Sequence, residues 1–275
     1  MTALTSRHHP IVKDFRAAAR GGDVMLLDGW HLLAEAVAAG VPIDTLAVCG
    51  PPTAQQQTVI DRARAAHARV VEVSTAVLNA MSPVSSPTGV VATARKPAVE
   101  ASAVLTPAPA LVLAGFSLQD PGNAGAVIRS AAAAGATGVM LDEASADPWG
   151  WKALRASMGG VFHLPVIRSR HPLTVLGAWR AAGVKLVAAE PRGGVPLHEL
   201  DLTGPVAVLM GGEGPGLPAE ALSAADARIS IPMAGAVESL NVAVAAALIL
   251  YEARRQRSST QGTLGTVGTI RHPNS

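Results

Sequence analysis

The segment Ile231-Pro-Met-Ala-Gly-Ala-Val-Glu-Ser-Leu-Asn241-Val-Ala-Val-Ala-Ala-Ala-Leu-Ile-Leu-Tyr-Glu252 decides how the C-terminal half of this chain is organised. Pro232 and Gly235 interrupt regular structure, Ser239 or Asn241 can cap a helix start, and an uninterrupted apolar run follows. A helix that is apolar on nearly every side must be buried on nearly every side. The segment therefore predicts a polar loop that a buried helix holds in place, as a functional site requires.

The composition is that of a globular protein with one large domain or two ordinary ones in 275 residues. Apolar residues make up 49% and aromatic residues only 3%, so the core must consist of Ala, Val, Leu and Ile. The formal net charge of +2 is by itself a weak signal for nucleic-acid binding. Most basic residues are Arg, which favours bidentate phosphate contacts, although a GC-rich genome produces the same bias.

The single cysteine, Cys49, rules out a disulfide within the chain and a Cys-based metal site, and we expect no metal. It lies in a strand-like apolar run, which indicates a small core residue rather than a nucleophile. His8, His9 and Lys13 stand where a signal peptide would be apolar, and the apolar run 242–251 is too short to span a bilayer. We therefore expect a cytoplasmic protein.

The N-terminal part alternates helices and strands, which predicts an α/β domain over residues 1–95. The expected helices are 12–20, 30–39, 55–67 and 77–81, and the expected strands are 24–27, 45–48, 70–73 and 89–94. Residues 96–109 are rich in Pro and Ala and have no clear periodicity, so they are predicted to be an interdomain linker.

A second α/β series predicts another domain over residues 110–257. Its expected strands are 110–114, 138–141, 162–167, 185–189, 205–210 and 228–231, and its expected helices are 124–134, 152–158, 173–182, 218–224 and the run after Asn241. Nearly continuous Val, Leu and Ala in these strands predicts a parallel sheet covered on both faces. Residues 258–275 belong to a segment rich in Ser, Thr, Gly and Gln, which predicts a disordered tail.

Three polar loops follow strands of the second series, at residues 119–123, 211–216 and 234–241. Ligands of open α/β sheets bind beyond the carboxyl ends of the strands, so these loops should form one site. Each loop carries side chains that folding does not require: Asn123, Glu213, and the group Glu238, Ser239 and Asn241.

Residue types alone leave the roles of these loops open. The glycines of residues 211–216 lack the Lys-Ser/Thr of a P-loop and the spacing of a dinucleotide fingerprint, so a nicotinamide-dependent oxidoreductase fits poorly. They indicate either close approach to a ligand or a tight turn. Asn123 could cap a helix. Arg129 could lie on a solvated helix face or contact an anion near a helix N-terminus.

Three stretches closely resemble, in order and spacing, the motifs of the SpoU (TrmH) family. This family comprises S-adenosylmethionine-dependent RNA ribose 2′-O-methyltransferases of the SPOUT superfamily. The stretches are Asp120-Pro-Gly-Asn-Ala-Gly-Ala-Val-Ile-Arg-Ser-Ala131, Met210-Gly-Gly-Glu-Gly-Pro-Gly-Leu217 and residues 231–245. The block 152–165, with Arg155, looks like the family's segment between the first two motifs. Residues 1–95 resemble more loosely its L30e-like substrate-binding domain, with Asp28-Gly29 where the family usually has Glu-Gly.

The resemblance implies a trefoil-knotted parallel-sheet methyltransferase domain preceded by a smaller L30e-like α/β domain, in a homodimer that uses S-adenosylmethionine. It maps the catalytic centre onto Asn123, Arg129, Glu213, Ser239 and Asn241. It maps the cofactor contacts onto Met210, Gly211, Gly212, Gly216, Ile231, Met233 and Leu240. The family casts Arg129 as the base. A guanidinium stays protonated, so we assign Arg129 instead to a phosphate or to the developing alkoxide.

RNA contacts are expected at Arg155 and in the first domain, which would recognise RNA by shape and phosphate. The candidates near the N-terminus are Arg7, His8, Lys13, Arg16 and Arg20, and the alternative for each is an ordinary solvated helix face. Two functions from different classes follow. One is an RNA 2′-O-methyltransferase, acting on 23S ribosomal RNA or alternatively on tRNA. The other is a catalytically silent RNA-binding protein of the same fold.

Overall fold

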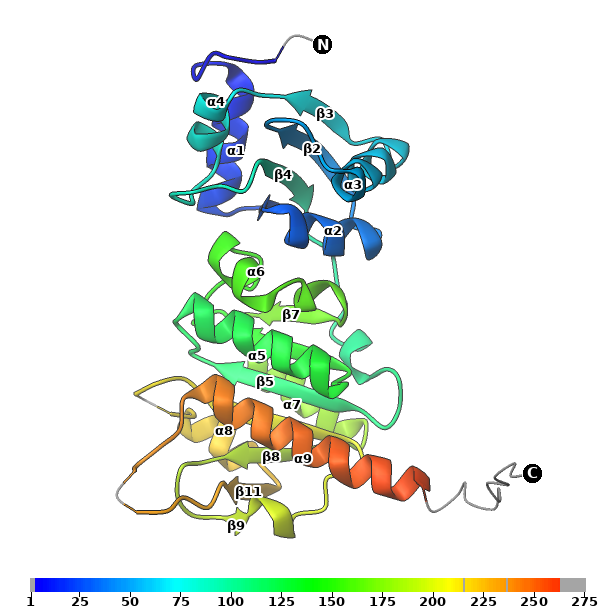
Figure 1. Cartoon of the computed structure of the whole chain (residues 1–275). Helices are drawn as coiled ribbons and strands as arrows, with labels where there is room; N and C mark the ends of the chain where they lie inside the picture. The colour runs from blue at the N-terminus through cyan, green and yellow to red at the C-terminus, as the bar shows by residue number, and fades with distance from the viewer. Residues whose placement is uncertain (1–2, 215, 236, 263–275) are drawn as a thin grey trace, which may run out of the picture.

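The computed structural model describes residues 3–214, 216–235 and 237–262. Within these residues the strands form two sheets, a four-stranded sheet in the N-terminal part and a seven-stranded sheet in the C-terminal part. Figure 1 shows the N-terminal sheet and its helices at one end of the molecule, with the larger sheet below them.

The N-terminal sheet has strand order β1-β4-β2-β3. Its elements are α1 (Pro10–Arg20), β1 (Val24–Asp28), α2 (Trp30–Ala38), β2 (Ile43–Val48), α3 (Ala54–Ala65), β3 (Arg69–Glu72), α4 (Thr75–Met81) and β4 (Val90–Arg95). Strand β4 runs antiparallel to β1 and β2, while β2 and β3 are parallel. Helices α1 and α4 pack on one face around Phe15 and Leu78, and α2 and α3 pack on the other.

The C-terminal part begins with the 3-10 helix η1 (Ala103–Leu105) and builds a parallel sheet of order β7-β6-β5-β10-β8-β11-β9. The strands are β5 (Leu111–Phe116), β6 (Gly138–Asp142), β7 (Val166–Ser169), β8 (Lys185–Ala189), β9 (Val195–Pro196), β10 (Val206–Gly211) and β11 (Ala227–Ser230). The helices are α5 (Pro121–Ala134), α6 (Trp151–Ser157), η2 (Gly160–Phe162), α7 (Pro172–Ala181), η3 (Leu197–Glu199), α8 (Ala219–Ala224) and α9 (Val242–Gly262).

Both faces of the large sheet are covered, as the nearly continuous apolar strands predict. Leu176 and Trp179 of α7 and Ala221 of α8 pack on the face that carries Phe116 and Met140. Helices α5 and α9 cover the opposite face, where Val208 and Leu113 are fully buried. In Figure 1, α5 and α9 cross this face side by side.

Helix α6 joins the two parts of the molecule. Its crossing with α5 is close because Gly125 has no side chain, and a Cβ there would overlap the carbonyl oxygen of Ala153. On its other side, Trp151 packs against the core between α1, α4 and the small sheet. An ion pair of Lys96 Nζ with Asp147 Oδ2 at 2.7 Å and a hydrogen bond between His163 Nε2 and Glu35 Oε2 at 2.7 Å add to this junction.

Several predicted boundaries are wrong. Helix α9 continues to Gly262, so residues 258–262 are helical where a disordered tail is predicted, and residues 263–275 lie outside the described residues. The predicted strand 162–167 is instead η2 followed by β7. Residues 96–109 contain no long element, but they are packed, because Val104 is fully buried beside Trp179.

Candidate active site

The carboxyl ends of β10, β8 and β11 meet at one cavity of about 380 Å³. The loop after β10 and the loop before α9 form its walls, together with Val242, Ala245 and Ile249 on α9. Parallel strands bring their carboxyl ends to the same edge, which explains why loops far apart in sequence converge here. The apolar run after Asn241 thus supplies one wall of the cavity.

Close backbone packing shapes the glycine loop after β10. Gly212 donates its N–H to the carbonyl oxygen of Phe116 at 2.7 Å, and a Cβ on Gly212 would overlap the carbonyl oxygen of Ser117. A Cβ on Gly211 would overlap the backbone of Gly216 and Leu217. The glycines therefore allow a tight turn, and they also line the cavity, while close approach to a ligand stays a prediction.

Three side chains from the three predicted loops form one hydrogen-bonded triad. Asn123 donates from Nδ2 to Glu213 Oε1 at 2.7 Å. Asn241 donates from Nδ2 to Asn123 Oδ1 at 3.0 Å and to Glu213 Oε1 at 3.2 Å. These bonds fix the orientation of both amides, because the donors face the carboxylate. The expectation that the three loops form one site is met in this geometry.

Asn241 also begins helix α9. Its Oδ1 accepts the backbone N–H of Ala243 at 2.9 Å, so one side chain caps the helix and joins the triad. Asn123, in contrast, is not a helix cap. Asp120 caps α5 by accepting the N–H of Asn123 at 2.8 Å, and Pro121 occupies the first turn, so the helix starts three residues earlier than predicted.

All the residues mapped as cofactor contacts line the cavity. They are Met210, Gly211, Gly212, Gly216, Ile231, Met233 and Leu240. Ser239 and Glu213 line it as well, which places the triad at its rim. Sequence reasoning missed Ala189, Glu190 and Pro191, which also line the cavity. They follow β8, so the rule that selected the other loops could have found them.

Arg129 does not join this group. It is exposed on α5, and its Cα faces Gly160 of η2, so it lies on the side of α5 toward α6 and η2. Among the described residues, no hydrogen bond or ion pair links Arg129 to the triad.

The predicted RNA contacts are exposed and lie away from the cavity. Arg155 is on α6 at the junction of the two parts. Burial raises the pKa of Asp28 on β1, while the Ser82 hydroxyl and the charge of Arg155 act to lower it. Arg7 precedes α1, and Lys13 and Arg16 lie on α1, where Arg16 Nε donates to the carbonyl oxygen of Ala80 at 2.8 Å.

Comparison with known proteins gives a family match for each of the two parts of the chain. Residues 110–251 match the SpoU rRNA methylase family, and residues 20–92 match the MRM3-like substrate-binding domain. The chain belongs to the SpoU rRNA methylase family. It is therefore an RNA methyltransferase of that family, as the three motifs predict.

Relatives of this SpoU methylase match either most of its length or about half of it. A tRNA/rRNA methyltransferase of Synechocystis, itself uncharacterised, is 35% identical over 95% of this chain and 97% of its own. The 23S rRNA (guanosine(2553)-2′-O)-methyltransferase RlmP of Bacillus subtilis is 40% identical over 50% of this chain, which spans only 55% of RlmP.

Among solved structures, the SpoU methyltransferase AviRb of Streptomyces viridochromogenes, in complex with AdoMet, superposes with a TM-score of 0.83. It is 31% identical, over 92% of this chain and 99% of that one. Among the described residues, no helix is long and apolar enough to cross a membrane, and no cluster of His, Cys, Asp and Glu is placed to hold a metal ion.

Proposed function

We propose that this SpoU methylase transfers a methyl group from S-adenosylmethionine to a ribose 2′-hydroxyl of 23S ribosomal RNA. The triad of Asn123, Glu213 and Asn241 at the rim of the cavity carries this proposal. The 2′-O chemistry and the 23S substrate are supported by the relative RlmP, whose name states both.

The residues of the cavity fit S-adenosylmethionine. The volume of about 380 Å³ lies in the range of roughly 300–1,000 Å³ typical of small-molecule sites. Apolar side chains, including Leu217, Ile229 and Ile249, suit a flat heterocycle, and backbone groups of the glycine loop suit its polar edge. Glu190 and Glu213 offer carboxylates for the cationic parts. When bound, the cofactor supplies a methyl group on a positively charged sulfur.

The triad has the chemistry to orient the attacking hydroxyl. Two of the three bonds within the triad reach Glu213, both at Oε1, and among the described residues no hydrogen bond reaches its Oε2. We assign Oε2 as the acceptor of the ribose 2′-O–H, so that Glu213 would position the hydroxyl oxygen and take up its proton. Asn123 and Asn241 keep the carboxylate in this orientation, with Ser239 beside them at the cavity rim.

Arg129 is exposed on α5, and its guanidinium stays protonated, which supports a contact with an RNA phosphate rather than a role as base. Arg155, Arg7, Lys13 and Arg16 belong to the same proposal as phosphate contacts. All of them are exposed, as phosphate contacts must be.

We also propose a homodimer in which the partner covers α9. Val244, Leu248 and Tyr251 are 49%, 45% and 50% exposed, and their i, i+4, i+7 spacing places them on one face of α9. A helix this apolar is otherwise buried, so the expectation of burial on nearly every side is not met within one chain. The knot expected from the resemblance belongs to the proposal as well, supported by the position of β10 between β5 and β8.

The test is methyl transfer from radiolabelled S-adenosylmethionine to unmodified 23S RNA, 16S RNA and tRNA, with the methylated nucleotide mapped. We expect transfer to 23S RNA at a 2′-oxygen. Asn123→Ala should lower the rate at least about 100-fold while binding of S-adenosylhomocysteine persists, as for the loss of a transition-state contact. Methylation of a base, or full activity of a folded Asn123→Ala variant, would contradict the proposal.

A further inference from the structure

A second cavity, also of about 380 Å³, opens at the same carboxyl edge of the large sheet, beyond β5, β6 and β7. Its lining includes Phe116, Asp142, Arg170, His171, Thr174 and Glu220. These residues belong neither to the three motifs nor to the triad. They lie at strand ends and helix starts on the face of the sheet that α7 and α8 cover.

This cavity and the catalytic cavity share a wall. Leu217 lines the catalytic cavity, and the next residue, Pro218, lines the second one. At the floor, the carbonyl oxygen of Phe116 accepts the N–H of Gly212 at 2.7 Å, and Gly212 directly precedes Glu213 of the triad. A polymer whose reacting unit sits at Glu213 can therefore place a neighbouring unit in the second cavity.

The cavity lining suits a phosphate. Arg170 pairs with Glu143 at 3.1 Å, but both side chains are more than half exposed, so a ligand can replace this weak contact. His171 precedes α7 and makes no side-chain cap, and the Thr174 hydroxyl lies in the first turn. An arginine, a hydroxyl and a helix N-terminus together favour an oxyanion.

The cavity lining also suits hydrogen-bond donors, because it includes Asp142. Asp142 is only 8% exposed, and its Oδ1 accepts the N–H groups of Ser117 and Ser145 at 2.9 Å each and the Ser145 hydroxyl at 2.6 Å. Within the described part of the chain, no hydrogen bond reaches Asp142 Oδ2, although the residue lines the cavity. A carboxylate oxygen in this position accepts from the amino group of a base or from a ribose hydroxyl.

We propose that the second cavity binds a nucleotide of the substrate RNA next to the methylated one. The phosphate lies at Arg170 and the start of α7, and the base or ribose donates to Asp142. A nucleotide combines an anionic phosphate with hydrogen-bond donors, which matches Arg170, the Thr174 hydroxyl and the Asp142 carboxylate in the cavity lining. This inference rests on the proposed RNA substrate and adds to it a subsite that reads the sequence flanking the target.

The experiment compares Thr174→Glu with Ala178→Glu. Both positions are exposed on α7 and one turn apart, and only Thr174 lines the cavity. A glutamate in the first turn of a helix is favourable, so Thr174→Glu should fold at least as well as its control. We expect Thr174→Glu to weaken binding of 23S RNA and to raise KM for it about ten-fold, with unchanged affinity for S-adenosylhomocysteine. Ala178→Glu should behave like wild type.

Each outcome decides the proposal. Equal RNA affinity of the two variants overturns it, and so does a loss of cofactor binding in Thr174→Glu. A calorimetric titration with the four nucleoside 5′-monophosphates tests whether the natural ligand of the cavity is a free nucleotide rather than RNA. If Thr174→Glu abolishes binding of a monophosphate and leaves RNA affinity intact, the site is for a free nucleotide and the RNA subsite is wrong. If the wild-type protein methylates none of the RNAs, the proposed function is refuted. The RNA affinities of the two variants then still decide whether the subsite exists.

Discussion

Asn241 combines two tasks in one residue, and the atoms that perform them are different. Its Oδ1 caps α9 through the N–H of Ala243, and its Nδ2 donates to Asn123 and Glu213. Exchange of the amide for a carboxylate separates these tasks, because an Asp keeps the cap and has no donor.

We therefore predict that Asn241→Asp keeps the helix cap and folds, but loses methyl transfer at least about 100-fold, since it has no donor and places a second carboxylate beside Glu213. Denaturant unfolding and single-turnover methylation measure the two effects. Asn241→Ala is the matched control and should lose both activity and about 1 kcal/mol of stability. An active Asn241→Asp variant would show that the amide donor is not required.

At the same scale, the sequence identifies the residues of the triad but not their partners. Asn123, Glu213 and Asn241 stand out because loops rarely need such side chains. The cap of α5 was missed because Asp120 and Asn123 are both good caps, and only Pro121 in the first turn distinguishes them. Glu190 was missed because a single acidic residue after a strand is common on any surface.

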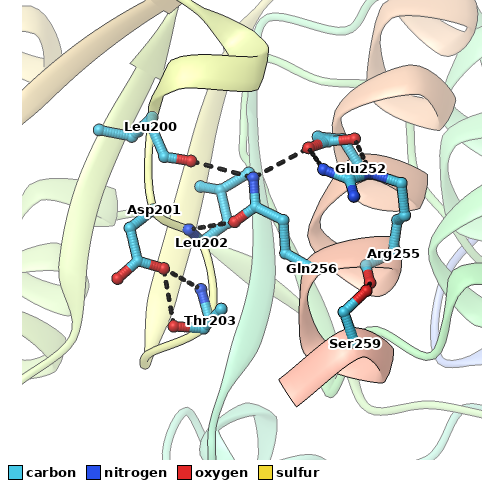
Figure 2. Close-up of polar contacts among 8 residues, drawn as sticks. All are labelled: Leu200, Asp201, Leu202, Thr203, Glu252, Arg255, Gln256 and Ser259. Atoms are coloured by element: carbon cyan, nitrogen blue, oxygen red, sulfur yellow. Dashed lines mark hydrogen bonds and ion pairs between the residues drawn. The ribbon is translucent and has the colours of Figure 1, made fainter. Parts of the chain in front are cut away.

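The last turns of α9 show how tertiary contacts override composition. In Figure 2, Gln256 donates to the carbonyl oxygen of Leu200 at 3.1 Å and accepts the N–H of Leu202 at 2.8 Å. Arg255 and Gln256 also bond Glu252, and the hydrogen bond from Arg255 is the main cause that lowers the pKa of Glu252 to about 2. Composition at residues 258–262 predicts disorder, and these long-range bonds are invisible in a local window.

Arg257 holds this end of α9 most firmly. Its guanidinium donates to the carbonyl oxygens of Leu202, Pro109, Ala110 and Gly204, at 3.0, 2.8, 2.9 and 2.6 Å. Burial lowers its pKa, although the group stays charged. One side chain thus ties α9 to the segment before β5 and to the loop before β10.

We predict that Arg257→Leu lowers the free energy of unfolding by about 2 kcal/mol, because four carbonyl groups lose a charged donor. The midpoint of urea unfolding measures this change. Arg255→Ala is the control, since the exposed side chain of Arg255 bonds Glu252 one turn away in the same helix, and it should shift the midpoint much less. Equal midpoints for the two variants would refute this role of Arg257.

At the scale of the whole molecule, Val244, Leu248 and Tyr251 form an apolar stripe on α9 that stays exposed in a single chain. Sequence periodicity could not separate burial within the chain from burial against a second copy, because an apolar helix looks the same in both cases. The two-sheet arrangement was predictable, since alternating elements are a local property. The contacts of α6 with both parts could not be predicted, because Gly125 and Trp151 pack against residues that are distant in sequence.

We predict that Leu248→Glu converts a dimer into a monomer, because a buried unpaired carboxylate is costly at an apolar interface. Sedimentation equilibrium with and without S-adenosylhomocysteine measures the mass. Ala178→Glu adds the same charge on the other face of the sheet and should leave the dimer intact. A monomeric wild-type protein at micromolar concentration would contradict the proposed interface.

The junction around α6 has an optical consequence. Two of the four tryptophans lie there, Trp151 against the core of the small sheet and Trp149 with its ring centroid 6.5 Å from that of Phe162. Lys152 adds a positive charge 5.5 Å from the Trp151 ring. Indole emission responds to nearby charge and to water, so a displacement of the N-terminal sheet against α6 changes the intrinsic fluorescence of the unlabelled protein. Trp179, buried beneath the large sheet, supplies a steady background signal.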